Sequence, residues 1–178
     1  MTTKYYIDGS FQTFSKPNPE DTTKPIIHEI CGFGCAVINP DGSITELKGA
    51  SEFETHSHNI TSELQACYAA LNHAITNNIK DIKIYHDLEG TSRWALGSWK
   101  TNNNETKQYA QDVHDMQQQY GLNIQFEKVK GHSGVKYNEL ADSLADQAVQ
   151  EYVAKHNIIP TFKVPQDAFM AVLKMDEE

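Results

Sequence analysis

The sequence predicts an α/β fold, in which helices flank a mixed β-sheet. Two observations predict this class. The first half of the chain is rich in strand-forming side chains and turns, and from residue 59 onward helical spacing alternates with strand-like alternation. Strand–helix–strand units imply parallel pairing within one sheet. We therefore expect the order strand, strand, strand, helix, strand, helix, strand, helix.

Strands dominate the first fifty residues. KYYID, residues 4–8, is a short run of aromatic and β-branched side chains, which favours a strand. Residues 15–25 hold three prolines and predict a solvated loop. From Gly32, the run GFGCAVINPDGSITELKGA predicts a β-hairpin that turns around residues 39–42. This half therefore supplies three strands.

The second half alternates helices with strands. At Asn59 apolar side chains begin to recur every three or four residues, which predicts a helix with one buried face. Residues 79–87 and 122–129 alternate as strands do. Between them, TSRWALGSW predicts a short helical segment, and ETKQYAQDVHDMQQQYG predicts a helix that ends at its glycine. The last helix is expected over residues 138–155.

A single domain accounts for most of the 178 residues. We expect a domain over residues 1–155 and a C-terminal extension over 156–178, to which we assign no function. No stretch approaches the roughly 18 apolar residues of a membrane helix, and MTTKYYIDGS lacks the pattern of a signal peptide. Three cysteines without a CxxC pair predict packing roles in a reducing compartment. We therefore expect a cytoplasmic protein without contact to a membrane.

Four acids stand at the ends of four predicted elements: Asp8, Glu63, Asp87 and Asp142. Ligands in α/β sheets gather at the carboxyl ends of parallel strands, so these acids are expected to meet there. Clustered carboxylates raise one another's pKa, and a hard divalent cation relieves this repulsion. Because the cluster offers only oxygen, it suits Mg²⁺ or Mn²⁺. Two such ions about 3.5–4 Å apart favour hydrolysis of a phosphodiester.

Four sequence blocks carry a specific resemblance: YIDGS, HNITSELQA, IYHDLEG followed by RWALGSWK, and VKGHSGVKYNELADSLA. In this order and spacing they resemble the type 1 ribonuclease H family over about residues 4–150. The GHSG block, with an aspartate ten residues after its histidine, is the most specific. The resemblance implies a five-stranded mixed sheet with helices on both faces. It also implies endonucleolytic hydrolysis of the RNA strand of RNA–DNA hybrids, with 5′-phosphomonoester products.

The resemblance assigns the four acids to catalysis and to metal binding. Asp8, Glu63, Asp87 and Asp142 match the family's ligands for two Mg²⁺ ions, with Mn²⁺ as a substitute. His132, in the glycine-bounded loop, resembles the mobile histidine that assists proton transfer or product departure. All five are therefore expected to be catalytic.

Further positions match residues that hold the hybrid. RNA–DNA hybrids present a wide minor groove in which 2′-hydroxyls mark the RNA strand. Glu139 and Asn138 resemble residues that support the metal ligands without binding the metal, and Trp94 is expected in the core. The expected substrate contacts are Gly9, Ser10, Asn59, Trp99 and Asn138.

The sequence departs from the family pattern in two places. Ile60 stands where many members carry an amide side chain, and TNNNETKQY lacks the lysine-rich protrusion of some members. The net charge of −9 also opposes binding of a polyanion. Four of these charges belong to the metal site, however, and Lys128, Lys130 and Lys136 form a basic stretch around the loop. We expect a monomer with modest affinity for the hybrid.

Three alternatives stay open at this stage. The fold also serves DNA strand transfer and resolution, although those relatives usually lack the GHSG block. A catalytically silent hybrid-binding module is a second alternative, which the intact acids disfavour. The third treats His56 and His58 as zinc ligands, but no nearby cysteine or acid completes a zinc spacing.

Overall fold

The structure is a computed structural model that describes residues 1–53, 57–131, 135–158 and 162–163. Up to residue 155 its strands and helices follow the order that the sequence predicts, and one short strand that was not predicted lies beyond it. The strands are β1 (Thr3–Lys16), β2 (Ile26–Ile38), β3 (Ile44–Glu52), β4 (Asp81–His86), β5 (Asn123–Lys128) and β6 (Phe162–Lys163). The helices are α1 (Asn59–Thr76), α2 (Glu89–Ala95), α3 (Asn104–Tyr120) and α4 (Lys136–Lys155).

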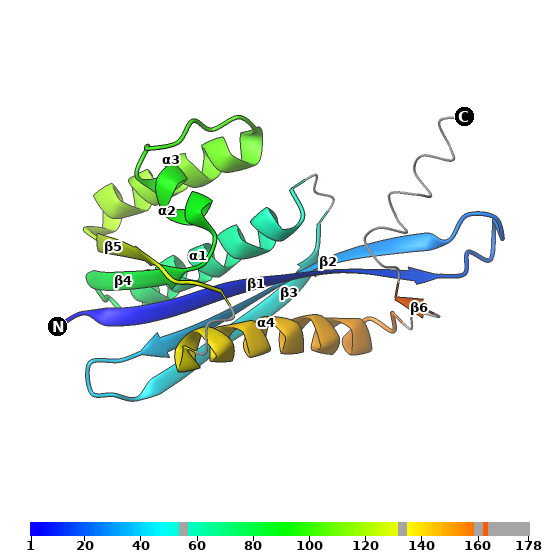
Figure 1. The fold of residues 1–178 in the computed structure, drawn as a ribbon, viewed down its shortest axis with the longest axis horizontal. Helices are drawn as coiled ribbons and strands as arrows, with labels where there is room; N and C mark the ends of the chain where they lie inside the picture. The colour runs from blue at the N-terminus through cyan, green and yellow to red at the C-terminus, as the bar shows by residue number, and fades with distance from the viewer. Residues whose placement is uncertain (54–56, 132–134, 159–161, 164–178) are drawn as a thin grey trace.

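The strands form one mixed sheet in the order β3-β2-β1-β4-β5 (Figure 1). The hairpin strands β1, β2 and β3 pair antiparallel, whereas β4 pairs parallel with both β1 and β5. The short β6 adds an antiparallel pair to β1. The predicted five-stranded mixed sheet is therefore confirmed.

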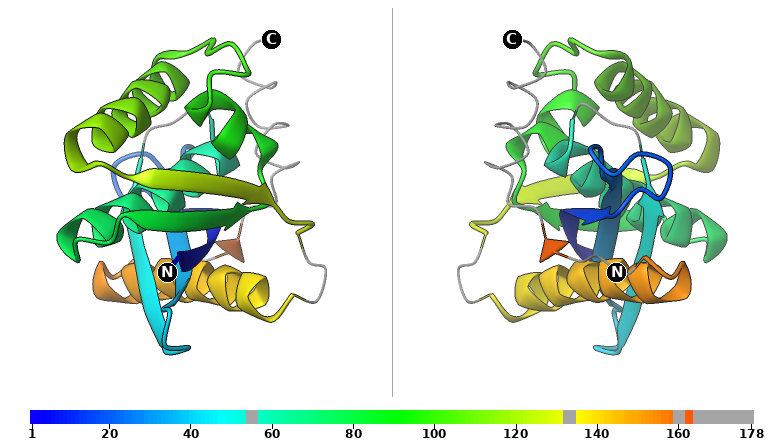
Figure 2. Two further views of the ribbon diagram at one scale, coloured as in Figure 1. Left: turned by 90° about the vertical axis from the view of Figure 1, so that its left-hand side faces the viewer. Right: turned by 90° about the vertical axis from the view of Figure 1, so that its right-hand side faces the viewer.

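Helices cover both faces of this sheet (Figure 2). On one face α1 packs against β1 and β2, with α2 and α3 beside it, and on the other face α4 crosses β1, β2 and β3. The main core lies between the sheet and α1, where the apolar stripe of α1 meets Tyr5 and Ile7 of β1 and Tyr109 of α3. This core holds α1 rigidly against the centre of the sheet, and it thereby fixes the start of the helix near the middle of β1.

The hairpin of β1 and β2 is longer than the sequence predicts. The expected strand of residues 4–8 continues to Lys16, and its partner begins at Ile26, so only the tip between them is a loop. Both strands project beyond the rest of the sheet (Figure 1). A second, small apolar cluster holds the projecting part: Phe14, Ile30, Val149 and Ile158.

The described residues also bear on two smaller expectations. All three cysteines are buried and free, which confirms their packing role. No helix in the described ranges combines the length and the apolar character needed to cross a bilayer. The cytoplasmic location and the boundary after residue 155 stay predictions.

Candidate active site

Three carboxylates lie together where β1 and β4 stop pairing. The last parallel pair joins Tyr6 to Tyr85, and Asp8 and Asp87 each follow two residues later, at the same level of the sheet. Glu63, in the second turn of α1, completes the group. One carboxylate oxygen from each of the three acids lies within 4.8 Å of the other two.

Gly9 allows this approach. A Cβ built on Gly9 would lie 2.5 Å from the carbonyl carbon of Ser62 and 2.6 Å from the nitrogen of Glu63, so only glycine fits between β1 and α1. The backbone N–H of Gly9 also donates to Asp8 Oδ1 at 2.8 Å. The glycine after Asp8 therefore brings Glu63 against the aspartate and orients the aspartate as well.

Burial and mutual repulsion shift the ionisation of two of these acids. Asp8 is 5% exposed and Glu63 is 8% exposed. Burial raises the pKa of Asp8 to about 6, and the charges of Asp87 and Asp142 add to this rise. Burial, followed by the charge of Asp8, raises the pKa of Glu63 well above its ordinary value. The side-chain hydrogen bond between the two acids raises the pKa of Glu63 further and lowers that of Asp8.

The turn after β4 fixes the third carboxylate. The buried His86 ring lies 2.8 Å through Nδ1 from the carbonyl oxygen of Leu88, and burial lowers the pKa of His86. A neutral ring that donates from Nδ1 ties together the residues on either side of Asp87. Gly131, the first residue of the GHSG block, lies against Asp87, because a Cβ there would be 2.9 Å from Asp87 Oδ2.

The fourth predicted ligand stands close to the group of three. Asp142 is half-buried in the second turn of α4, and its charge raises the pKa of Asp8. It does not belong to the set of acids within 4.8 Å of one another in the described residues. Its role as a ligand stays a prediction, and so does the role of His132, which lies outside the described residues.

The predicted supporting residues occupy different environments at the start of α4. Asn138 is buried, and its side-chain oxygen has no hydrogen-bond partner within the described structure, whereas Glu139 is exposed. The resemblance implies both a substrate contact and a supporting role for Asn138. Burial favours the supporting position for its amide, and its role stays a prediction.

Three of the remaining substrate positions are accessible. Ser10 is half-buried and Asn59 is exposed at the first residue of α1. Trp99 is 44% exposed, with its ring edge-on to Trp94 at 5.9 Å between centroids. Trp94 packs against the main core, as the sequence predicts.

One residue beside the site has no motif of its own in the sequence. Asp146 follows Asp142 by one turn of α4 and accepts a hydrogen bond of 2.6 Å from Ser10 Oγ. Two spacings in the sequence could together reveal Asp146. It follows Asp142 by four residues on the helix, and Ser10 follows Asp8 by two residues on the strand. Neither spacing predicts a contact between Ser10 and Asp146 unless α4 is known to lie across β1.

The donor set fits a hard divalent cation. The three clustered acids supply only carboxylate oxygens, and Glu63 Oε2 is buried without a hydrogen-bond partner in the described structure. A cation there would satisfy the orphaned oxygen and would offset both the burial of the charges and the repulsion that together raise the two pKa values. No other group of three or more His, Cys, Asp or Glu with ligand geometry occurs in the described ranges. The zinc alternative gains no support, since His58 packs on Phe11 and His56 lies outside those ranges.

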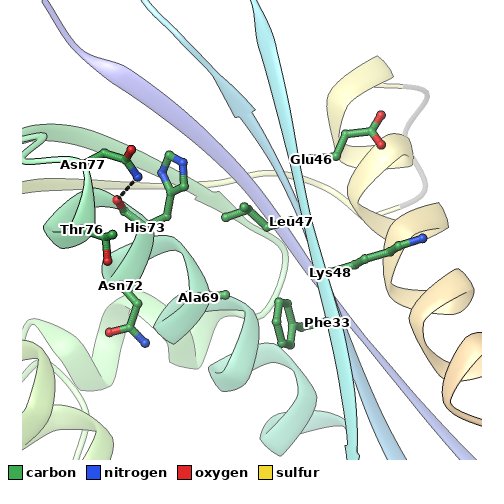
Figure 3. A pocket seen from close by; sticks show the side chains of 9 residues that line it. All are labelled: Phe33, Glu46, Leu47, Lys48, Ala69, Asn72, His73, Thr76 and Asn77. Carbon is green, nitrogen blue, oxygen red and sulfur yellow. Dashed lines mark hydrogen bonds between the residues drawn. The ribbon is translucent and has the colours of Figure 1, made fainter.

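A hollow elsewhere on the molecule is separate from this site (Figure 3). It has a volume of about 520 Å³ and lies between β3 and the second half of α1, so the length of the helix separates most of its lining from Glu63. Phe33, Leu47 and Ala69 give it an apolar lining, and Glu46 is its one acidic residue. It therefore lacks the cluster of carboxylates that hydrolysis of a phosphodiester would use.

Comparison with known proteins places the chain in a family. The family model described as RNase H matches residues 28–150, a range that holds Glu63, Asp87 and Asp142 but begins after Asp8. The chain is 34% identical over 132 residues to the Ribonuclease H of Bartonella bacilliformis, covering 68% of this chain and 80% of the relative. It is 32% identical over 138 residues to the Ribonuclease H of Francisella philomiragia, covering 71% and 85%.

Solved structures agree on the fold. The RNase H1 from the halophilic archaeon Halobacterium salinarum NRC-1 superposes with a TM-score of 0.62 at 21% identity, over 85% of this chain and 99% of that one. LC11-RNase H1, solved in complex with an RNA/DNA hybrid, gives 0.63 at 16% identity, over 85% and 99%. With the family match over most of the chain, these findings mean that the chain belongs to the RNase H family.

Proposed function

We propose that the chain is a metal-dependent endoribonuclease that hydrolyses the RNA strand of RNA–DNA hybrids. The observation that best supports this proposal is the carboxylate cluster. One oxygen each from Asp8, Glu63 and Asp87 lies within 4.8 Å of the other two, although the three acids come from different parts of the chain. Membership of the RNase H family supports the choice of substrate, and relatives named Ribonuclease H cover most of the chain. All three acids come from one chain, and we propose a monomer as the active form.

We further propose that two Mg²⁺ ions occupy the site, with Mn²⁺ as a substitute. Asp8, Glu63 and Asp87 would hold them, and Asp142 would complete the set from α4. Bound there, the ions supply Lewis acidity that activates a water and stabilises the leaving oxygen of a phosphodiester.

The chain's own residues prepare the site for this chemistry. Gly9 holds Asp8 against the start of α1, and the His86 ring fixes the turn that carries Asp87. Burial of Glu63 keeps bulk water from one side of the cluster, which strengthens every charge interaction within it. We propose that His132 accepts or returns a proton at the reacting phosphate, and that Glu139 and Asn138 support the site from α4.

The substrate would lie across the exposed residues around these acids. Ser10, Asn59 and Trp99 are the accessible positions that we propose as contacts, with the backbone of Gly9 beside them. Lys128 contributes less positive charge than the sequence alone indicates, because its ammonium lies 3.8 Å from Glu89. Few phosphate contacts predict a shallow dependence of affinity on salt.

The testing experiment uses an RNA-labelled hybrid incubated with Mg²⁺, with Mn²⁺ or with a chelator. We expect cleavage of the RNA strand in either metal, products with 5′-phosphates, and intact duplex DNA and duplex RNA. Asp8→Asn should abolish the cleavage. Binding of the hybrid without cleavage in either metal would favour a silent binding module, and cleavage that survives Asp8→Asn would contradict the metal site.

A further inference from the structure

A second pair of facing side chains lies just outside the carboxylate cluster. Moving along β1 from Asp8, the next side chain on the same face is Ser10, and moving along α4 from Asp142, the next turn brings Asp146. Ser10 Oγ donates to Asp146 Oδ1 at 2.6 Å. The seam between β1 and α4 therefore carries two successive pairs, which we name the inner pair (Asp8 and Asp142) and the outer pair (Ser10 and Asp146).

The same packing device builds both pairs. Gly34 lies opposite Asp8 in the β1–β2 register, and Gly32 lies opposite Ser10. A Cβ on Gly34 would lie 2.0 Å from the carbonyl oxygen of Ala141, and one on Gly32 would lie 2.6 Å from that of Ala145. The backbone of α4 therefore rests on β2 at both glycines.

The residues that follow these two contacts on α4 are the two acids. Asp142 follows Ala141, and Asp146 follows Ala145. Two residues along a strand span about 6.7 Å and four along a helix about 6 Å, so the two repeats stay nearly in step. The hydrogen bond between Ser10 and Asp146 is thus set by backbone packing and does not depend on a chance meeting of surface side chains.

This hydrogen bond decides what Ser10 can offer to a ligand. A serine hydroxyl has one proton and two lone pairs, whereas an ionised carboxylate only accepts. Ser10 must therefore donate its proton to Asp146, and only lone pairs are left for another partner. Within the chain, Gln12 Nε2 approaches Ser10 Oγ at 3.4 Å, a long contact that leaves room for a better donor.

We propose that Asp146 is a positioning residue that fixes the Ser10 hydroxyl as a hydrogen-bond acceptor for a ribose 2′-hydroxyl of the bound strand. This inference rests on the proposed function, which brings an RNA strand to Asp8. A 2′-hydroxyl can donate the hydrogen bond that Ser10 accepts, and deoxyribose has no such donor. Asp146 thus contributes to the choice of RNA over DNA without touching the substrate.

The test uses full-length protein and hybrids in which one ribose at a time, around the main cut, carries 2′-fluorine in place of the hydroxyl. Fluorine keeps a ribose-like sugar but cannot donate. In the wild type, we expect one position at which this change lowers kcat/KM by on the order of 10-fold, as loss of one hydrogen bond predicts. Ser10→Ala should reduce that effect to about 2-fold or less, because the acceptor is gone.

The variant Asp146→Asn should reduce the fluorine effect in the same way. The amide can donate to Ser10 Oγ, which frees the serine proton and ends its fixed role as acceptor. Asp146→Glu keeps an acceptor-only group and should retain a fluorine effect near that of the wild type, which also guards against loss of folding as the cause. The matched control is Glu151→Gln, which removes the same charge from the same helix at a residue paired with Lys48, and it should leave the effect unchanged.

The outcomes separate the inference from the function on which it rests. A wild type that cuts unmodified hybrid, with a fluorine effect equal in the wild type and in Asp146→Asn, would overturn the inference alone. Equal reductions in Asp146→Asn and Glu151→Gln would also overturn it, since charge and not position would then matter. A wild type that cuts no hybrid in Mg²⁺ or Mn²⁺ would overturn the proposed function and the inference with it.

Discussion

The inner and outer pairs of the β1–α4 seam share their backbone geometry and differ in chemistry. In the inner pair a glycine opposite Asp8 brings α4 close, and the result is an aspartate whose pKa is raised by burial and, to a smaller extent, by the neighbouring acids. In the outer pair the same arrangement places a hydroxyl against a carboxylate, and the result is a satisfied hydrogen bond. The backbone sets the distance between β1 and α4 at each pair, and the side-chain chemistry determines whether a cation is needed to stabilise the pair.

The largest expected effect is at the buried acid of the cluster. Glu63→Gln should lower cleavage of hybrid by more than about 100-fold, because the site loses an ionisable ligand for the cation. In a chelator the same change should raise the free energy of unfolding by on the order of 1 kcal/mol, because it removes a buried acid beside Asp8. Chemical denaturation with and without Mg²⁺ measures the second effect.

A control variant that also removes one carboxylate separates the loss of the metal site from the loss of charge. Glu151→Gln removes one exposed carboxylate that pairs with Lys48, so stability and cleavage should change little. If both variants lowered cleavage equally, net charge would explain the loss and the metal site would not be needed. If Glu63→Gln were destabilising in a chelator, the repulsion within the cluster would be overstated.

The next effect concerns the glycines that seat the helix. Gly34→Ala should destabilise the fold by more than about 2 kcal/mol, because the added methyl group meets backbone atoms of α4 at both Ala141 and Ala145. Gly32→Ala should cost less, because one of its two close contacts is the Val149 side chain, which can move. Urea unfolding compares the two.

One outcome for Gly34→Ala and Gly32→Ala would contradict the idea that these glycines seat α4 on β2. Equal and small losses, of less than about 0.5 kcal/mol, would show that α4 can lift from β2 without cost. The inner pair would then not be held by the backbone. Gly42→Asn, in the β2–β3 turn, has open space around its Cβ position but a φ of +85°, so it measures the cost of backbone strain without a steric clash.

A third effect is the pH dependence of stability in the metal-free protein. Asp8 has a pKa of about 6 in the folded chain and an ordinary value of 3.8, so the folded state binds more protons between these values. Stability should therefore fall as pH rises through this window, by on the order of 3 kcal/mol, and Glu63 acts with the same sign. Asp8→Asn should flatten the slope.

The outer pair provides the contrast for this measurement. Ser10 has no charge to lose, so Ser10→Ala should leave the pH slope of unfolding close to that of the wild type. Unfolding curves at several pH values in a chelator test both variants. A slope that Ser10→Ala flattens as much as Asp8→Asn would contradict the assignment of the effect to the inner pair.

The smallest effect is expected one step further along the seam. Gln12 and Gln150 face each other there, with Gln150 Nε2 3.4 Å from Gln12 Oε1, a long and exposed contact. Gln12→Ala should change cleavage by less than about 2-fold and stability by less than about 0.5 kcal/mol. A larger loss of cleavage would extend the substrate contacts beyond the outer pair.

Much of the fold was predictable because its signals are local. The helical spacing from Asn59 and the alternation of residues 79–87 correspond to α1 and β4 with small shifts at the ends. The meeting of Asp8 with Asp87 was also predictable, because both follow strands that must pair in parallel. Glu63 joined them through the start of the next helix, which the order of the elements also indicates.

The long β1–β2 hairpin was not predictable, because distant contacts hold it. Residues 9–16 have little alternation of apolar side chains, and what fixes them is the register with β2 and the small cluster that includes Val149 and Ile158. Asp146 was missed for a similar reason. Its meaning depends on Gly32, and no sequence pattern says which helix lies over a given glycine.

Binding of the cation itself tests the central claim most directly. Calorimetric titration of Mg²⁺ into the wild type at pH 7 should show saturable binding, which Asp8→Asn weakens by more than about 10-fold and Glu151→Gln leaves unchanged. This is the expected result if the fold holds the carboxylates together and a cation offsets their repulsion. Equal affinity in the wild type and Asp8→Asn, or no binding by the wild type, would contradict the account.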